Sequence, residues 1–190
     1  MSNKTQPSAL DLPMVDPLPE ATQKYFDICI EKLGMIPNVL QTNAFDIDKL
    51  NTFTAMYNDL MLAQSGLSKL EREMIAVVVS AINSCYYCLT AHGAAVRALS
   101  DNPMLGEQLV MNYRVADLDA RQRAMLDFAV KVTNASSTIE EGDRQVLRDV
   151  GFSDRDIFDI ANVTGFYNMS NRVANAIDMR PNDEYHSQNR

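Results

Sequence analysis

The segment from Ser68 to Ile82 restricts the fold more than any other part of the chain. Ser68 and Glu71 have the spacing of a capping box, in which each side chain accepts a hydrogen bond from the other residue's backbone amide at the start of a helix. From Met74 to Ile82 every residue except Ser80 is apolar, so a helix here is apolar on all sides. The run is too short for a membrane span, which needs about 20 apolar residues. We therefore predict a central helix that its neighbours bury.

The rest of the chain after residue 19 also shows apolar residues at helical spacing, and no stretch alternates convincingly with the period of two that a strand requires. Gly34 is expected to end the first helix, and Asn102 with Pro103 marks a later connection. The fold class that this pattern predicts is all-α, a multi-helix bundle. The expected helices span residues 20–33, a short helix from 37, then 45–64, 68–82, 84–99, 119–134, 138–151 and 153–179.

The helical part is expected to form one domain over residues 20–180, flanked by two segments of different character. Residues 1–19 hold four of the seven prolines and are expected to form an extended arm. Residues 181–190 form a polar tail, in which His186 is expected to be solvated.

The net charge of −8, with no cluster of lysine and arginine, argues against a nucleic-acid partner and against an anionic membrane surface. The first residues lack the apolar stretch of a secretory signal. Three cysteines, an odd number, do not suit the disulfide framework of a secreted domain. We expect a cytoplasmic protein.

Cys85, Cys88 and His92 form a C-x-x-C-x3-H pattern. In a helix these three side chains share one face, and the two cysteines can approach closely enough to form a disulfide. If Ser84 caps that helix, Cys85 lies in its first turn, where free backbone amides favour a thiolate. Cys88 then has His92 within reach for proton exchange. Because thiolates are reactive and histidine moves protons near neutral pH, the pattern predicts a dithiol redox centre with a proton relay.

Glu73 joins this group only if the chain reverses between two helices. In one straight helix it would lie about 18 Å from the first cysteine of the pair. Asn83 and Ser84 interrupt the helical pattern, and a helical hairpin there would place Glu73 within a turn of His92. In that position the carboxylate can orient the imidazole, which can deprotonate the second cysteine.

The same residues allow two other interpretations. A C-x-x-C pair can be two buried structural cysteines, since free cysteine is among the most buried residue types. Alternatively, Cys85, Cys88 and His92 can hold zinc with Glu73 as a fourth ligand. Ligands from one helix usually need a second Cys or His pair elsewhere, which this chain lacks. The third cysteine, Cys29, lies on an apolar helical stripe and is expected to be core.

Glu73, Cys85, Cys88 and His92 together give E-x11-C-x-x-C-x3-H. In this signature the chain resembles the AhpD-like alkylhydroperoxidases of the carboxymuconolactone decarboxylase superfamily, over most of its length from about residue 20 to residue 185. Flanking segments that look like the branch called peroxidase-related proteins are Gly34–Asn38, Asn83–Cys88 and Gly165–Arg172.

The resemblance implies an all-helical subunit that forms homo-oligomers and needs no haem, metal or other cofactor. It implies that Cys88 is the peroxidatic thiol, that Cys85 is the resolving thiol, and that Glu73 and His92 relay protons. The substrate would be an organic hydroperoxide or hydrogen peroxide, and a dithiol reductant, small or protein-borne, would be the partner. Tyr87 stands where the best-studied peroxidases often have histidine, a departure that bears on the rate and on the reductant.

The leading hypothesis is therefore a thiol-dependent peroxidase or disulfide oxidoreductase, whose activity rises between about pH 5 and 8 as His92 loses its proton. One alternative is a non-catalytic redox-sensing or binding oligomer. Another is a lactone decarboxylase of the same superfamily, a chemistry that does not need the C-x-x-C pair. The aromatic residues expected either to line an apolar pocket or to serve as core or subunit contacts are Tyr86, Tyr87, Phe166 and Tyr167.

Overall fold

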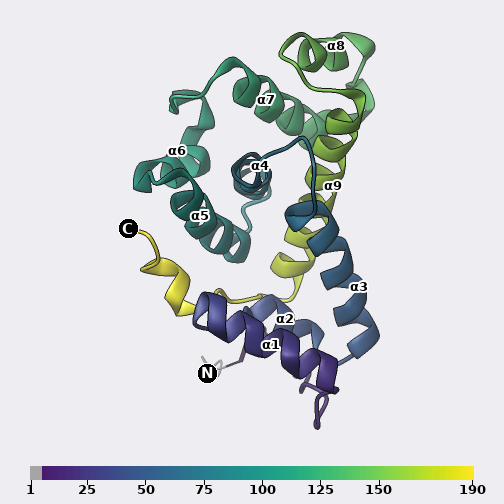
Figure 1. Ribbon diagram of the computed structural model, residues 1–190, viewed down its shortest axis with the longest axis vertical. Coiled ribbons are helices and arrows are strands. Elements are labelled where there is room, and N and C mark those ends of the chain that lie inside the picture. The colour runs from purple at the N-terminus through teal and green to yellow at the C-terminus, as the bar shows by residue number, and fades with distance from the viewer. Residues whose placement is uncertain (1–5) are drawn as a thin grey trace.

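The structure, a computed structural model, describes residues 6–190, and its regular elements in this range are all helical (Figure 1), as the sequence predicts. Short turns of π-helix or 3-10 helix lie at Asn58–Leu62, Tyr113–Val115, Ser136–Thr138 and Asp183–His186. The α-helices are α1 (Glu20–Leu33), α2 (Asn38–Asn43), α3 (Ile47–Tyr57), α4 (Lys69–Ile82), α5 (Tyr86–Ser100), α6 (Pro103–Asn112), α7 (Ala120–Ala135), α8 (Glu141–Asp149) and α9 (Asp154–Ala176).

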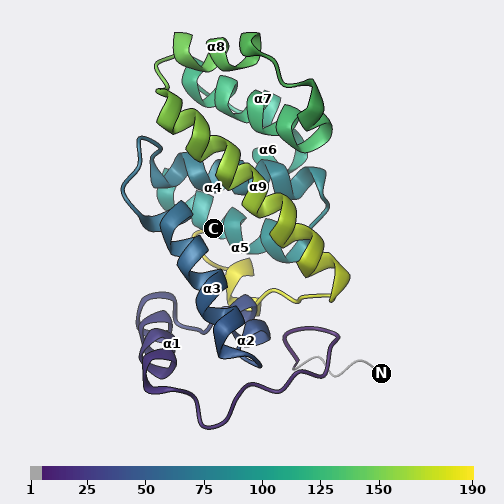
Figure 2. The ribbon, with the colours of Figure 1, turned by 90° about the vertical axis from the view of Figure 1, so that its right-hand side faces the viewer.

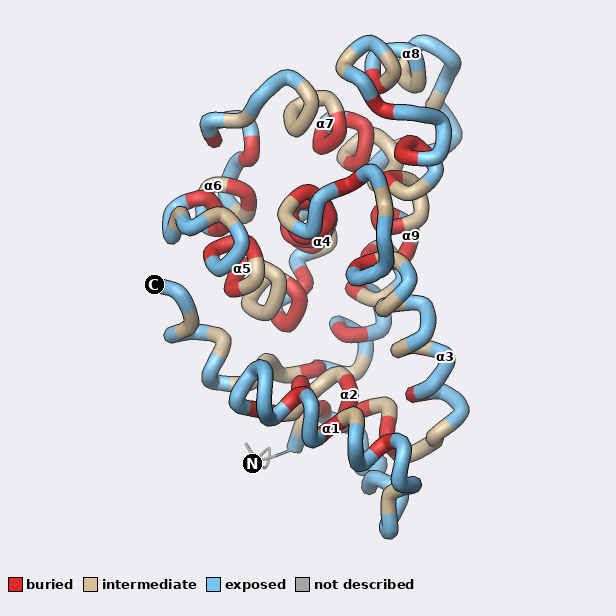
Figure 3. Tube along the Cα trace, viewed as in Figure 1, coloured by how far each residue is buried: buried red, intermediate tan, exposed pale blue. Residues whose placement is uncertain are grey.

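Helix α4 is the central element of the fold. Figure 1 shows it end-on, and α5, α6, α7 and α9 all pack against it. Every residue from Glu71 to Ser80 is buried, and Figure 3 shows α4 as a largely buried coil at the centre of the molecule. The predicted central helix is thus confirmed, and it is buried because its apolar side chains point in all directions.

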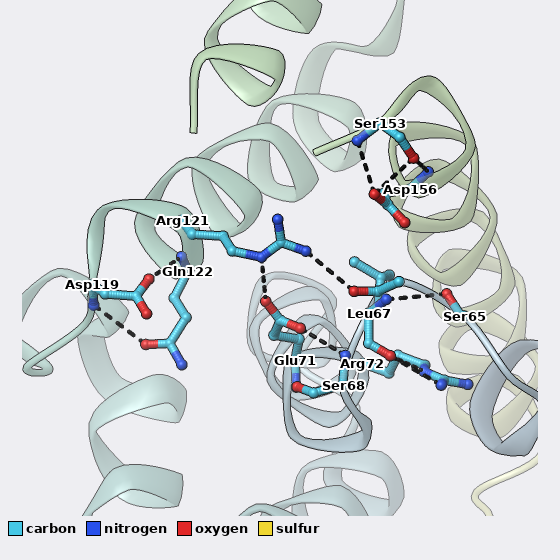
Figure 4. Close-up of polar contacts among 11 residues, drawn as sticks. Ser65, Leu67, Ser68, Glu71, Arg72, Asp119, Arg121, Gln122, Ser153 and Asp156 are labelled. Atoms are coloured by element: carbon cyan, nitrogen blue, oxygen red, sulfur yellow. Dashed lines mark hydrogen bonds and ion pairs between the residues drawn. The ribbon is translucent and has the colours of Figure 1, made fainter. Parts of the chain in front are cut away.

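The first turn of α4 buries two charged residues, both of which have partners (Figure 4). Glu71 accepts from the Ser68 amide at 2.7 Å, which completes the predicted capping box, and from Nε of Arg121 at 3.1 Å. Arg72 donates to the carbonyl oxygens of Leu67 and Leu60 at 3.0–3.2 Å. Because a buried polar group without a partner is costly, these bonds stabilise the first turn of the central helix.

Two further capping boxes in Figure 4 begin helices where the sequence predicts them. Asp119 and Gln122 exchange hydrogen bonds at the start of α7, and Ser153 and Asp156 do so at the start of α9. Helix α9 ends at Ala176, three residues before the predicted end.

Two other boundaries differ from the prediction. Helix α3 begins at Ile47 because Asp46 caps it, accepting from the amides of Asp48 and Lys49. Helix α8 begins at Glu141, because the Asp143 carboxylate binds the Glu140 amide at 2.8 Å. The predicted start at residue 138 is therefore wrong.

Helix α6 was not predicted, because Asn102 and Pro103 suggested only a connection. Asn102 is in fact its N-cap, and its side chain accepts from the Met104 amide at 3.0 Å. Pro103 occupies the first helical position, where its missing N–H costs nothing.

Helices α1 and α2 form a second layer beneath the α4 bundle, which Figure 2 shows at the lower end of the molecule. This layer has a small core of its own, composed of Phe26, Cys29, Leu40, Ala44 and Leu50. It matters for function because it closes one side of the pocket described below.

Of the predicted arm, residues 1–5 lie outside the described residues, and residues 6–19 are mostly exposed but hydrogen bond to the rest of the chain. The Ala9 amide donates to the carbonyl oxygen of Ile177, and the Val15 amide donates to that of Ala44, both at 2.9 Å. Within the described residues, no helix is long and apolar enough to cross a membrane.

Candidate active site

The turn between α4 and α5 brings the predicted site residues together. Asn83 ends α4, and Ser84 follows in the left-handed conformation with a φ of 52°. The Cys85 amide donates to the Ser80 carbonyl oxygen at 3.0 Å and the Ser84 amide to that of Ala81 at 3.2 Å, the Schellman arrangement that ends helices. The chain reverses here, which confirms the predicted helical hairpin.

The prediction that Ser84 caps α5 is wrong. Cys85 is the N-cap residue, and the helix begins at Tyr86. Ser84 cannot take that position, because its left-handed backbone closes the preceding helix while an N-cap residue is extended. Cys85 therefore lies one position before the first turn of α5. The sequence predicted that it would lie within that turn.

The hairpin places Glu73 of α4 against His92 of α5. Glu73 Oε2 and His92 Nδ1 are 2.7 Å apart, and the two side chains are only 10% and 13% exposed. Because an ionised carboxylate only accepts hydrogen bonds, Nδ1 carries the proton in this pair. In the neutral imidazole Nε2 then has a free lone pair, so His92 is set to act as a base through Nε2.

Cys85 and Cys88 are both reduced and buried, 0% and 2% exposed respectively. The pKa of Cys85 is lowered from 9.0 to about 7, chiefly by a hydrogen bond from the Cys88 thiol, with smaller contributions from the Cys88 amide and from His92. The same bond, together with burial, raises the pKa of Cys88 well above its ordinary value. The pair therefore loses its first proton from Cys85, while Cys88 stays a thiol unless a base takes its proton.

Two polar residues beside the thiols were not predicted. Asn171 of α9 and Ser80 of α4 are fully buried, and Asn171 Nδ2 donates to Ser80 Oγ at 3.0 Å. Both hydrogen bond to Cys88 and partly offset the increase in its pKa. Asn83 donates to Asn171 Oδ1 at 3.0 Å, which ties the turn to α9. The sequence signal for this contact is Ser80 itself, the one polar residue of the apolar run from Met74 to Ile82.

A pocket of about 590 Å³ lies between α5, α9 and the layer of α1 and α2. Cys88, His92 and Glu73 line it, whereas Cys85 lies outside the lining that the described residues form. Much of the wall is apolar or aromatic, and it includes Ile28, Leu33, Leu40, Phe53, Leu62, Ala91, Phe166 and Tyr167. A small organic molecule that enters this pocket therefore meets the sulfur of Cys88 and not that of Cys85.

Known proteins resemble this chain in both sequence and fold. The model of the carboxymuconolactone decarboxylase family matches residues 48–103. An uncharacterized peroxidase-related protein from Silicibacter sp. TM1040 is 72% identical over the whole of both chains, with a TM-score of 0.97. The chain belongs to the AhpD-like carboxymuconolactone decarboxylase family.

Other solved structures that share the fold are less similar in sequence. An uncharacterized peroxidase-related protein from Ralstonia eutropha JMP134, described as an alkylhydroperoxidase AhpD core, is 44% identical over 97% of each chain, with a TM-score of 0.93. A protein of unknown function from Agrobacterium tumefaciens is 22% identical and shares the fold, with a TM-score of 0.64 over 72% of this chain and 92% of its own. No curated protein matches the sequence.

Tyr87 stands where AhpD-like peroxidases often have histidine, and hydrogen bonds to two other segments hold it in place. Its side chain is buried, its hydroxyl accepts from the Val39 amide at 3.1 Å, and it also contacts Tyr185. Tyr87 therefore ties α5 to α2 and to the C-terminal tail. Tyr86 is exposed instead, and its hydroxyl lies 3.1 Å from Nε2 of His186, so the exposed histidine of the tail has a protein partner.

The zinc interpretation gains no support from the AhpD-like site. Among residues 6–190, no group of three or more His, Cys, Asp or Glu side chains is arranged to hold a metal. Cys29 packs in the core of the second layer, as predicted, and it also lines the pocket.

Proposed function

We propose that this protein is a thiol-dependent peroxidase that reduces an organic hydroperoxide with the Cys85–Cys88 dithiol. The observation that supports this function is that Cys88, His92 and Glu73 line one largely apolar pocket, with Cys85 hydrogen-bonded to Cys88 just outside it. The pocket supplies an apolar site for the organic group, and the four residues supply a nucleophile, a base and a second thiol.

In the first step, Nε2 of His92 takes the proton of the Cys88 thiol, and Glu73 stabilises the imidazolium that results. The Cys88 thiolate attacks the terminal oxygen of the hydroperoxide, the O–O bond breaks, and its electron pair leaves on the carbon-bound oxygen. That oxygen takes the proton from His92 and departs as an alcohol. Cys88 is left as a sulfenic acid.

In the second step, the Cys85 thiolate attacks the sulfur of Cys88. The S–O bond breaks, and hydroxide leaves as water after taking a proton from solvent. In the reduced pair the pKa of Cys85 is lowered to about 7, so this thiol can give up its proton near neutral pH before the attack. The products are one alcohol, one water and one disulfide, and a dithiol reductant, small or protein-borne, restores the two thiols.

Disulfide mapping of the reduced protein after one equivalent of cumene hydroperoxide tests this function. We expect a bond between Cys85 and Cys88, and a dimedone-trapped sulfenic acid on Cys88 in a Cys85→Ser variant. The matched control is Cys29→Ser, which changes a thiol on the wall of the same pocket and should leave the disulfide unaffected. Two unreacted thiols would contradict the proposal.

The same material separates the alternatives. A redox-sensing oligomer would form the disulfide and change its assembly by light scattering, yet would consume no further hydroperoxide when a dithiol reductant is added. A lactone decarboxylase would keep its activity on a lactone in a Cys88→Ser variant. We also propose that the subunit forms a homo-oligomer, which light scattering measures directly.

A further inference from the structure

The pocket beside Cys88 has a mouth whose residues differ in character from the rest of the wall. Five of the residues that line the pocket are exposed, and they mark this mouth: Ile28, Lys32, Leu33, Leu62 and Lys69. The first three belong to α1, Leu62 ends the π-helical turn, and Lys69 begins α4. The mouth therefore combines three large apolar side chains with two positive charges.

The apolar residues of the mouth are open to water. Ile28, Leu33 and Leu62 are 45%, 44% and 53% exposed. Because the removal of apolar surface from water is favourable, a hydrocarbon chain that passes between these side chains is stabilised there. The mouth therefore favours a ligand whose apolar chain extends from the interior of the pocket to its surface.

The two lysines of the mouth are unpaired charges. Neither Lys32 nor Lys69 forms an ion pair within residues 6–190, whereas two other lysines of the chain are paired with carboxylates. The one carboxylate among the lining residues, that of Glu73, lies inside the pocket and binds His92. Both charges of the mouth are thus positive in a chain whose net charge is −8, so the mouth is suited to an anionic group.

The position of Lys69 is not explained by the helix that it begins. It is the first residue of α4, where the partial positive charge of the free amides disfavours a cation. Lys32 lies in the last turn of α1, which favours a cation by the same rule. Lys69 therefore places its charge at the mouth against the preference of its own helix.

The length of the pocket separates the lysines from the reactive thiol. Cys88 is buried inside the pocket, whereas Lys32 and Lys69 are exposed at its mouth. A ligand that reaches both must carry its reactive group and its anionic group several carbon atoms apart on an apolar chain. The volume of about 590 Å³ is ordinary for a pocket that holds an organic molecule.

We propose that the substrate is the hydroperoxide of a long-chain carboxylic acid, whose carboxylate binds Lys32 and Lys69 while its chain presents the hydroperoxide to Cys88. This inference rests on the proposed peroxidase function and names the substrate class of the same site. The product is the corresponding hydroxy acid, released with one water as the disulfide forms. Since exposed ion pairs are weak, the apolar chain supplies most of the affinity and the lysines supply the preference for an acid.

The test compares linoleic acid hydroperoxide with its methyl ester, which has the same chain and the same hydroperoxide but no charge. Both probes are used below the concentration at which they form micelles. The second-order rate constant of disulfide formation in the wild type should be about 3- to 10-fold higher for the acid, the effect of two exposed ion pairs. This preference should shrink at high salt, which screens exposed charges.

The variant that tests the lysines is Lys32→Gln with Lys69→Gln. It should react with the acid no faster than with the ester, while its rate constants for the ester and for cumene hydroperoxide stay those of the wild type. The matched control is Lys24→Gln with Lys49→Gln, which removes the same charge from two exposed residues outside the lining that the described residues form. The control should keep the wild-type preference for the acid.

The outcomes separate this inference from the proposed function. Equal rate constants for acid and ester in the wild type would overturn the inference alone, and so would a preference that survives in the Lys32 and Lys69 double variant. Wild-type protein that forms no disulfide with cumene hydroperoxide or with either probe would overturn the proposed function and this inference with it.

Discussion

Glu71 and Glu73 are two buried glutamates on the same helix, each 7% exposed, but they lie on different sides of α4 and have different partners. Glu71 faces α7, where it binds Arg121 and the Ser68 amide (Figure 4). Glu73 faces α5 and binds His92 on the wall of the pocket. Burial and residue type are the same for the two glutamates, and only the partner distinguishes them. Arginine holds a fixed charge whereas histidine exchanges protons, which is why we propose the relay role for Glu73 and not for Glu71.

The largest effect is expected on the side of α4 that faces α5. A His92→Gln variant should form the disulfide at least about 10²-fold more slowly, because no base remains to take the Cys88 proton. Stopped-time alkylation and mass analysis at one fixed pH measure the rates of the variant and of the wild type. A variant that reacts at the wild-type rate would remove His92 from the mechanism.

The thiol pair gives the next largest effect. Ultraviolet absorbance of the thiolate should titrate with a midpoint of about pH 7 in the wild type, owing to Cys85. In Cys88→Ala, which leaves no side-chain donor, the midpoint should move up towards 9.0, since the thiol hydrogen bond is the largest cause of the lowered pKa. Cys29→Ala is the control and should keep the wild-type midpoint. A midpoint that stays near 7 in Cys88→Ala would show that the helix terminus or His92 sets the pKa.

This titration also has a consequence for stability. The pKa of Cys85 is lower in the folded state than in the unfolded state, where it is near 9.0, so its contribution is complete above pH 9 and is lost as the pH falls through about 7. The free energy of unfolding should therefore rise from pH 7 to pH 9 in the wild type. Urea denaturation at several pH values should show this rise disappear in Cys85→Ser.

On the side of α4 that faces α7, the effect is on stability. Glu71→Gln should lower the free energy of unfolding by about 1–3 kcal/mol, because Arg121 and the Ser68 amide lose a charged acceptor. The rate of disulfide formation in the folded protein should not change. Urea denaturation combined with the single-turnover assay checks both, and a slower reaction in the folded variant would break the distinction between the two glutamates.

A smaller effect is expected at Tyr87. Tyr87→Phe should cost about 1 kcal/mol of stability, since the Val39 amide loses its acceptor. Tyr86→Phe is the control, because this exposed residue should change stability by less than about 0.5 kcal/mol. Equal effects of the two substitutions would mean that the hydrogen bond between the Val39 amide and Tyr87, which joins α2 to α5, adds little to the free energy of unfolding.

Local signals in the sequence predicted the frame of the site. The Ser68 capping box, the apolar run after Met74 and the break at Asn83 were enough to predict two helices. If the chain reversed at that break, the resulting hairpin would bring Glu73 to His92, as it does in the structure. These features depend on neighbours within one or two helical turns, which a sequence records directly.

What the sequence did not predict depends on contacts between distant segments or on backbone conformation. Ser84 has the chemistry of an N-cap, and only its left-handed backbone shows that it ends α4 instead. Asn171 reaches Ser80 across 91 positions of the chain, and no local pattern records that contact. The meeting of Lys32 and Lys69 at the mouth of one pocket is likewise a property of the packed chain, so it could not be read from periodicity.

The proposed mechanism is tested most directly by comparing Glu73→Gln with Glu71→Gln in the single-turnover reaction with cumene hydroperoxide, at a pH and temperature where both variants are folded. We expect Glu73→Gln to slow formation of the Cys85–Cys88 disulfide by about 10²-fold or more, while Glu71→Gln reacts at the wild-type rate. Equal rates in the two variants, whether fast or slow, would contradict it.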